Sequence, residues 1–152
     1  MAWSAANEPV GSGPGDERYL REAKRVVRRL DPSRLFAVDA SISPPEDLPA
    51  YYSELDALGL SNYIGWYGSR PLSDVRPALE EVHAGFPGVA LFQTEFGAEA
   101  NRHGPPAEKG SYAFQEAFLD AHLRPRRPAV DERAIVWLLH EWPDPLRSVR
   151  AV

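Results

Sequence analysis

The sequence predicts an α/β fold in which parallel strands alternate with helices. Short apolar segments recur between longer ones whose apolar residues lie three and four positions apart, as in consecutive βαβ units. Two acidic motifs, around Glu8 and Glu95, each follow an apolar segment and so lie where a strand gives way to a loop. At 152 residues the chain is long enough for one ordinary domain.

The first half of the chain predicts a helix between two strand regions. Met1–Ser4 indicates only the tail of a strand. The segment Asp16–Leu30 has apolar residues at helical spacing, with acidic residues in the first turn and basic residues in the last, and Asp31-Pro32 ends it. A short strand is expected at Leu35–Val38 and a weaker one at Leu55–Leu60.

The second half repeats the alternation. A helix is expected from Ser73 to Ala84, followed by a strand at Val89–Phe92. A further helix is expected at Tyr112–Leu123 and a last, strongly apolar strand at Ala134–Leu139. This order favours parallel pairing throughout.

Composition excludes several classes of function. The net charge is −5 and no basic patch suggests nucleic-acid binding, because Arg124–Pro128 is best explained as a solvated connection. No apolar stretch reaches 18 residues, so we expect no membrane partner. The N-terminus does not resemble a signal peptide, which favours a cytoplasmic location. The chain has no cysteine, and His140-Glu141 lacks metal-site spacing, so neither a metal nor a cofactor is expected.

Two carboxylates at the ends of different parallel strands suit glycoside cleavage. One group must protonate the leaving oxygen, and in retaining enzymes the other attacks the anomeric carbon. The motifs are Asn7-Glu8-Pro9 and Thr94–Glu99. Alternation along the second strand predicts one shared face, pointing into a barrel, for Val89, Leu91, Gln93 and Glu95.

Both motifs resemble glycoside hydrolase family 2, which includes β-galactosidases, β-glucuronidases and β-mannosidases. The resemblance is closest to the bacterial β-glucuronidase-like branch. Further segments that resemble this family are Trp3-Ser4, Leu30–Arg34, Asn62-Tyr63 with Trp66-Tyr67, and Phe96–Gln115.

The resemblance implies roles for three residues. Glu8 would be the acid/base and Glu95 the nucleophile. Asn7 would hydrogen-bond the 2-hydroxyl of the sugar, a contact that strengthens in the transition state.

Five further residues are candidates for substrate binding. Tyr63 is expected to position Glu95, while Trp66 and Tyr67 would stack on sugar faces, unless they only cover the core. His103 would line the pocket. In the family a tryptophan at the place of Trp137 forms the floor of the sugar subsite, although a core role is the alternative.

The resemblance also implies an incomplete fold. The expected architecture is the C-terminal part of a (β/α)8 TIM barrel, roughly strand four to strand eight, as a single partial domain over residues 1–152. A full barrel has roughly 250 residues. The first three strands and the family's β-sandwich domains would be missing, so the open barrel edges could mediate self-association or pairing with another half-barrel. The Asn and Lys pair with which β-glucuronidases bind the sugar carboxylate has no match, so the choice of sugar stays open.

Three functional hypotheses follow. The first is a retaining β-glycosidase fragment that hydrolyses β-glucuronides or β-galactosides through a covalent glycosyl-enzyme. The second is an inactive truncated product that works as a carbohydrate-binding or assembly module. The third is an inverting or family 5-like glycosidase, for which the carboxylates would lie about 6.5–9.5 Å apart.

Overall fold

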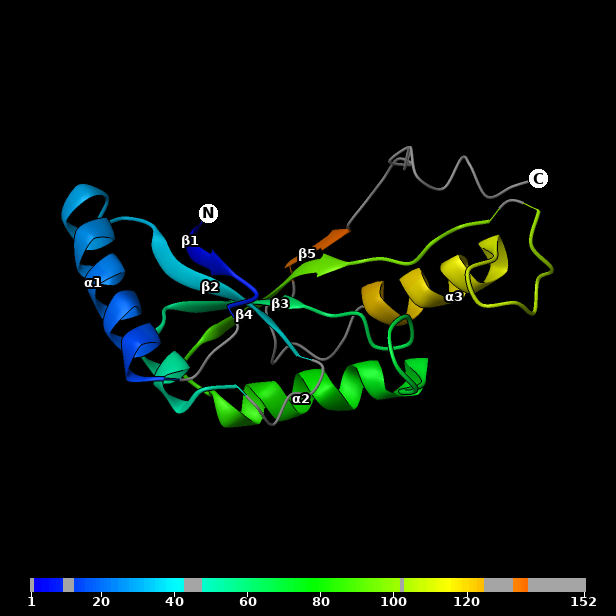
Figure 1. Cartoon of the computed structure of the whole chain (residues 1–152), viewed down its shortest axis with the longest axis horizontal. Coiled ribbons are helices and arrows are strands. Elements are labelled where there is room, and N and C mark those ends of the chain that lie inside the picture. Colours follow the sequence, from blue (N-terminus) through cyan, green and yellow to red (C-terminus); the bar gives the residue numbers. More distant parts are fainter. Residues whose placement is uncertain (1, 10–12, 43–47, 102, 125–132, 137–152) are drawn as a thin grey trace.

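The computed structural model describes residues 2–9, 13–42, 48–101, 103–124 and 133–136 (Figure 1). Its centre is a sheet of five strands in the order β1-β2-β3-β4-β5, and every neighbouring pair is parallel. The strands are β1 (Ala2–Asn7), β2 (Leu35–Ser41), β3 (Ala57–Ser61), β4 (Ala90–Phe96) and β5 (Arg133–Val136). The predicted α/β class is therefore confirmed, and the parallel sheet is consistent with part of a TIM barrel.

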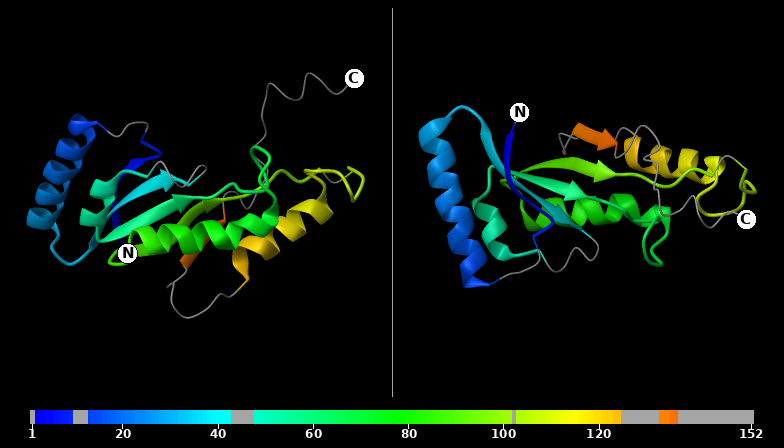
Figure 2. Two further views of the ribbon diagram at one scale, coloured as in Figure 1. Left: turned by 90° about the horizontal axis from the view of Figure 1, so that it is seen from below. Right: turned by 45° about the horizontal axis from the view of Figure 1, so that its top comes forward.

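Three helices connect and cover these strands: α1 (Pro14–Leu30), α2 (Val75–Gly85) and α3 (Tyr112–Leu123). Two short 3-10 turns, η2 (Ala50–Glu54) and η3 (Leu72–Asp74), precede β3 and α2. The helices follow one another around one side of the sheet (Figures 1 and 2). In the part of the chain that the structure describes, no helix is long and apolar enough to cross a membrane.

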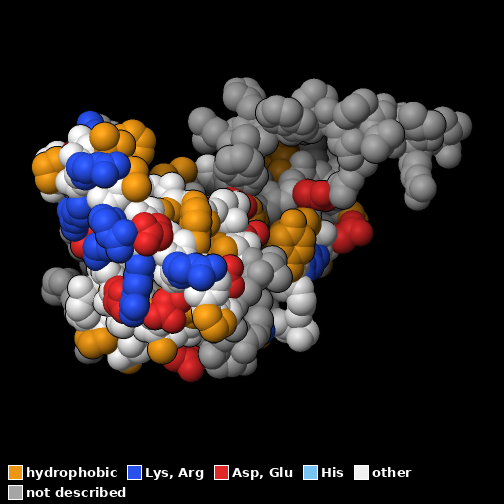
Figure 3. Space-filling view, turned by 60° about the vertical axis from the view of Figure 1, so that its left-hand side comes forward, with side chains coloured by type: hydrophobic (Ala, Val, Ile, Leu, Met, Phe, Trp, Pro, Cys, Tyr) orange, Lys and Arg blue, Asp and Glu red, His pale blue; other side chains and the backbone are white. Residues whose placement is uncertain are grey.

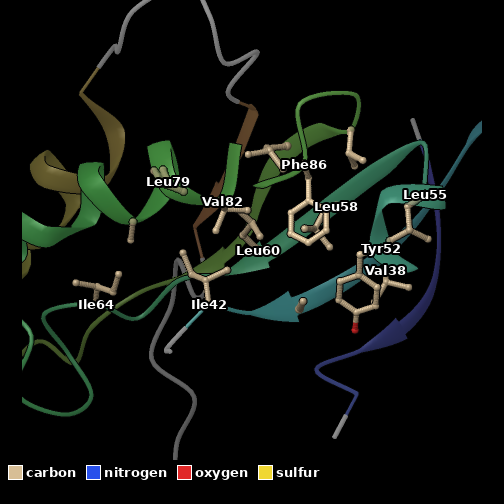
Figure 4. Packing of buried hydrophobic residues seen from close by; sticks show 14 of the residues in the cluster. Val38, Ile42, Tyr52, Leu55, Leu58, Leu60, Ile64, Leu79, Val82 and Phe86 are labelled. Carbon is tan, nitrogen blue, oxygen red and sulfur yellow. The ribbon is translucent and has the colours of Figure 1, made fainter. Parts of the chain in front are cut away.

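The main core lies between the sheet and its helices. Alternate residues of β2 and β3, such as Val38, Leu58 and Leu60, are fully buried and belong to the same apolar cluster as Leu79 and Val82 of α2 (Figure 4). The face of β2 and β3 that carries these side chains is buried because helices cover it, as expected for parallel sheets.

Helix α1 is joined to the strands by ion pairs as well as by its apolar face. Arg28 and Lys24 both pair with Asp56, at the start of β3, at 2.5 and 3.3 Å. Asp56 also accepts the backbone N–H of Phe36 at 2.7 Å. Burial opposes ionisation of Asp56, but the Phe36 N–H and the two cations outweigh it and lower the pKa of this carboxyl. The basic side chains gather over the α1 side of the molecule in Figure 3.

The predicted helices agree with the structure to within two residues at each end, whereas three strands extend further than predicted. Strand β2 continues past Val38 to Ser41. Met1–Ser4 was expected to be only a strand tail, but β1 runs from Ala2 to Asn7. Its small residues have weak strand propensity, and pairing with β2 holds them extended. Strand β4 continues past Phe92 to Phe96, so Glu95 belongs to the strand itself.

The predicted strand face around Glu95 is wrong. Leu91 lies in the core beneath the helices, and Gln93 Nε2 donates to the backbone oxygen of His122 in α3 at 3.1 Å. The register between β3 and β4 then shifts, so that Ser61 pairs with Glu95. This irregularity moves Glu95 to the face opposite Gln93, which simple alternation does not predict.

Candidate active site

Glu95 and Tyr63 form the centre of the candidate site. Tyr63 Oη donates to Glu95 Oε1 at 2.5 Å, which brings the expected partner to the expected carboxylate. Both groups are partly buried. The short hydrogen bond fixes the orientation of the carboxylate at the C-terminal end of β4.

The loop that carries Tyr63 is bound directly to β4. The backbone N–H of Asn62 donates to the backbone oxygen of Glu95 at 2.7 Å. Asn62 Nδ2 donates to Gln93 Oε1 at 3.1 Å, while its Oδ1 accepts the N–H of Ile64 at 3.3 Å. Asn62 is fully buried, so these bonds are shielded from water and hold the backbone on both sides of Tyr63.

The charge of Glu8 acts on the same tyrosine. Burial raises the pKa of Tyr63, and its hydrogen bond to Glu95 adds to the effect. The negative charges of Glu95 and Glu8 raise the pKa further, and the contribution of Glu8 is the smaller one. Glu8 therefore opposes the ionisation of Tyr63.

Glu8 has an unusual backbone conformation. It follows β1 with a φ of +43°, and it is the one described residue other than glycine with a positive φ. Its N–H donates to the backbone oxygen of Asp39 in β2 at 2.7 Å, and β1 and β2 lose register between Ser4 and Asn7. Such conformations are uncommon and cluster at functional sites. Asn7 and Glu8 are both exposed at this strand end.

The two aromatic residues predicted to stack on the sugar, Tyr67 and Trp66, differ in exposure. Tyr67 is 63% exposed, and its ring centre lies 5.1 Å from that of Tyr63. Trp66 is half-buried, packs on Phe114 at 5.9 Å and contacts Gly110. Tyr67 thus offers a free surface to a ligand, whereas much of Trp66 supports the loop.

The last two candidates are His103 and Trp137. His103 is exposed and its N–H donates to Asn101 Oδ1 at 3.0 Å; no hydrogen bond links it to Tyr63 or Glu95 among the described residues. Trp137 lies outside the described residues, as do His140 and Glu141. Among the residues that are described, no group of three or more His, Cys, Asp or Glu side chains could hold a metal ion.

Sequence reasoning missed a polar cluster on the face away from the helices. Ser4 Oγ donates to Asp39 Oδ2, and Gly59 faces Asp39 from the next strand. A Cβ on Gly59 would lie 1.9 Å from Asp39 Oδ1 and 2.7 Å from Thr94 Oγ1. The alternation of Gly59 and Ser61 between buried leucines was the signal that could have revealed this face. Within the described residues, the hydroxyls of Ser61 and Thr94 are buried without a hydrogen-bond partner.

Solved structures share the fold of this chain. No family model matches the sequence. An FMN-binding β-glucuronidase from Facaelibacterium prausnitzii L2-6 superimposes with a TM-score of 0.75 at 22% identity. Apo β-glucuronidase from Ruminococcus gnavus gives 0.73 at 26% identity, and Bacteroides uniformis β-glucuronidase gives 0.67 at 20%. The chain shares its fold with part of these β-glucuronidases.

The similarity extends over most of this chain but over little of the larger proteins. It covers 90%, 90% and 79% of this chain, and 22%, 25% and 15% of the three β-glucuronidases in the same order. The chain therefore spans about a quarter of their length or less. The expected resemblance to β-glucuronidase-like enzymes is confirmed for the fold. That the chain is a fragment of a glycosidase, and which barrel strands it contains, stay predictions.

Proposed function

We propose that this chain is the catalytic segment of a family 2 retaining β-glycosidase that hydrolyses β-glucuronides or β-galactosides. The observation that carries the proposal is the hydrogen bond from Tyr63 to Glu95 at a strand end, within electrostatic reach of Glu8. A tyrosine that orients one carboxylate beside a second one suits a mechanism in which the two acids have different tasks.

The reaction would proceed in two steps. Glu95 attacks the anomeric carbon and forms a covalent glycosyl-enzyme, while Glu8 protonates the departing oxygen. Glu8 then removes a proton from water, which attacks the anomeric carbon and releases Glu95. The Tyr63 hydroxyl binds Oε1 of Glu95, so Oε2 is the oxygen that would form the bond to the sugar.

Substrate binding would use the rest of the mouth. Asn7 would bind the sugar 2-hydroxyl, and the exposed ring of Tyr67 would stack on the ligand, supported by Trp66. We place His103 at the rim, because it is exposed and bound to the loop after β4. Trp137 follows β5 in sequence and would contribute the floor of the subsite.

A second candidate is an inactive product that binds carbohydrate or assembles with another polypeptide. It is favoured by the five-stranded open sheet, in which β1 and β5 each pair with a single neighbour among the described strands. Unpaired strand edges are templates for pairing with further chain, and a closed barrel has none. The glycosidase site would then need walls from elsewhere.

The test combines turnover with trapping of the intermediate. Nitrophenyl β-glucuronide and β-galactoside are offered to the wild-type chain, to Glu8→Gln and to Glu95→Gln. Glu81→Gln, at an exposed position of α2, is the control. We expect both site variants to lose turnover and a 2-fluoro glycoside to label Glu95 in the wild type. Sugar binding without turnover would favour the binding module, and an inverted product would contradict the retaining mechanism.

A further inference from the structure

The histidine of α3, His122, has an environment that its helix position alone does not explain. It is 1% exposed, and its ring stacks against Phe96 of β4 and Phe118 of α3, with ring centres 5.2 and 4.2 Å apart. Both ring nitrogens also have oxygen neighbours. Nδ1 lies 3.2 Å from Gln93 Oε1, and Nε2 lies 3.2 Å from the backbone oxygen of Ile64.

The direction of each hydrogen bond in this network is determined by backbone groups. The other end of the Gln93 amide contacts the backbone oxygen of His122, which only accepts, so that end must be the NH2 group. The oxygen of Gln93 therefore faces the His122 ring, and it also accepts Asn62 Nδ2. The orientation of Asn62 agrees, since its own oxygen accepts the N–H of Ile64.

Both nitrogens of His122 consequently face acceptors. A neutral imidazole carries one N–H, so one of the two contacts would set a lone pair against an oxygen; an imidazolium donates in both. Burial opposes the charge, but two stacked aromatic faces favour a cation.

We propose that His122 is a positioning residue that is held with a proton on both ring nitrogens and ties α3 and β4 to the loop that carries Tyr63. The two chain neighbours of Tyr63 are the residues in the network: Asn62 binds Gln93 and the backbone of Glu95, and Ile64 accepts from His122. Removal of both ring donors would loosen the backbone on either side of the Tyr63–Glu95 bond. Its importance for turnover rests on the proposed function, whereas its protonation state does not.

The first test is nitrogen-15 NMR of the histidine rings in the wild-type chain at pH 7. His122→Asn identifies the His122 signals by their loss, and half-buried His83 on α2 serves as the reference in the same spectra. We expect both ring nitrogens of His122 to carry protons that exchange slowly with water. A spectrum in which one of its nitrogens is unprotonated at pH 7 would overturn the proposal.

The second test measures the effect on Tyr63. His122→Phe keeps an aromatic ring in the stack but removes both donors, and His83→Phe is the matched control. With tyrosine labelled at Cζ, we expect Tyr63 to ionise at a lower pH in His122→Phe, because its bond to Glu95 is less well held. Unchanged ionisation of Tyr63 in the folded variant would contradict the positioning role. The wild-type spectra decide the protonation state even where this variant does not fold. Absence of turnover in the wild type and in all variants would contradict the proposed function. The two NMR results would not depend on that outcome, so the two failures can be told apart.

Discussion

Tyr63 connects the two carboxylates of the candidate site, since it binds Glu95 and lies in the field of Glu8. Its raised pKa has a consequence that does not depend on turnover. A group that holds its proton more firmly in the folded state contributes stability below its unfolded pKa, and this contribution is lost as the pH rises through the folded value. For tyrosine the loss begins near pH 10.

Tyr63→Phe should weaken the alkaline loss of stability. The free energy of unfolding of the wild type is expected to fall as the pH rises above about 10. The variant lacks the hydroxyl and should lose less over the same range. Urea unfolding at several pH values measures this, with exposed Tyr112→Phe as the control. Identical pH profiles for wild type and Tyr63→Phe would contradict the role of the buried hydroxyl.

Gly59 is required where β3 passes Asp39. A Cβ at this position would lie 1.9 Å from Asp39 Oδ1, so Gly59→Ala must displace the carboxylate. We expect a loss of about 1–3 kcal/mol in the free energy of unfolding, as for other overpacked sites. Gly15→Ala is the matched control, because nothing lies within 4 Å of its Cβ and alanine favours the helix. Equal stability of both variants would show that the polar face accommodates the methyl group.

The junction of α1 with β2 and β3 depends on one carboxylate, Asp56, which binds Lys24, Arg28 and the Phe36 N–H. Asp56→Asn should destabilise the protein by about 1–3 kcal/mol at pH 7, since charged hydrogen bonds are lost. Because the pKa of Asp56 is lowered, its contribution is present above the unfolded value of 3.8 and is lost as the pH falls below it.

Chemical denaturation from pH 7 to pH 3 checks the prediction for Asp56. The difference between wild type and Asp56→Asn should shrink as the pH falls, because the protonated carboxyl no longer binds the two cations. Asp120→Asn is the control, since exposed Asp120 pairs with Arg124 one turn away, its one ion pair among the described residues, and should change stability by less than about 0.5 kcal/mol. A constant difference at all pH values would exclude the charge as the cause.

At the level of elements, the sequence predicted the helices, because their apolar residues recur at helical spacing. The helix at Tyr112–Leu123 has the predicted bounds, because apolar residues at helical spacing are a local signal. Strand β1 was underestimated because Ser4, Ala5 and Ala6 become a strand only through pairing with β2. The face of Glu95 was missed because a register shift is a property of two strands, which no single-strand pattern contains.

The candidate site was predictable to a similar extent. The motifs gave Glu8, Glu95 and Tyr63; the structure joins Tyr63 to Glu95 by a hydrogen bond, and the charge of Glu8 acts on Tyr63. The network of Asn62, Gln93 and His122 was not predicted, because its members come from three elements and each residue alone is unremarkable. Side-chain hydrogen bonds of this kind follow from tertiary packing rather than from spacing.

For the whole molecule, the open sheet suggests association. Strand β1 lies at one end of the sheet, and an unprotected edge strand pairs readily with other chains. We expect concentration-dependent oligomers of the 152-residue chain in sedimentation velocity experiments. Ala2→Lys, at the exposed start of β1, should weaken these oligomers, while Ala84→Lys, at an exposed position of α2, should not. A monomer at every concentration would argue that the edges are covered.

The order of the strands in space equals their order along the chain. Each strand therefore pairs with one already synthesised, and none has to wait for a later partner before it can join the sheet. During synthesis, the Tyr63–Glu95 bond could form as soon as β4 leaves the ribosome, before α3 or β5 has emerged from it. His122 would leave the ribosome later and contact the loop that carries Tyr63, which is by then hydrogen-bonded to β4. Helix α3, which follows the site in sequence, would therefore complete the geometry of the site.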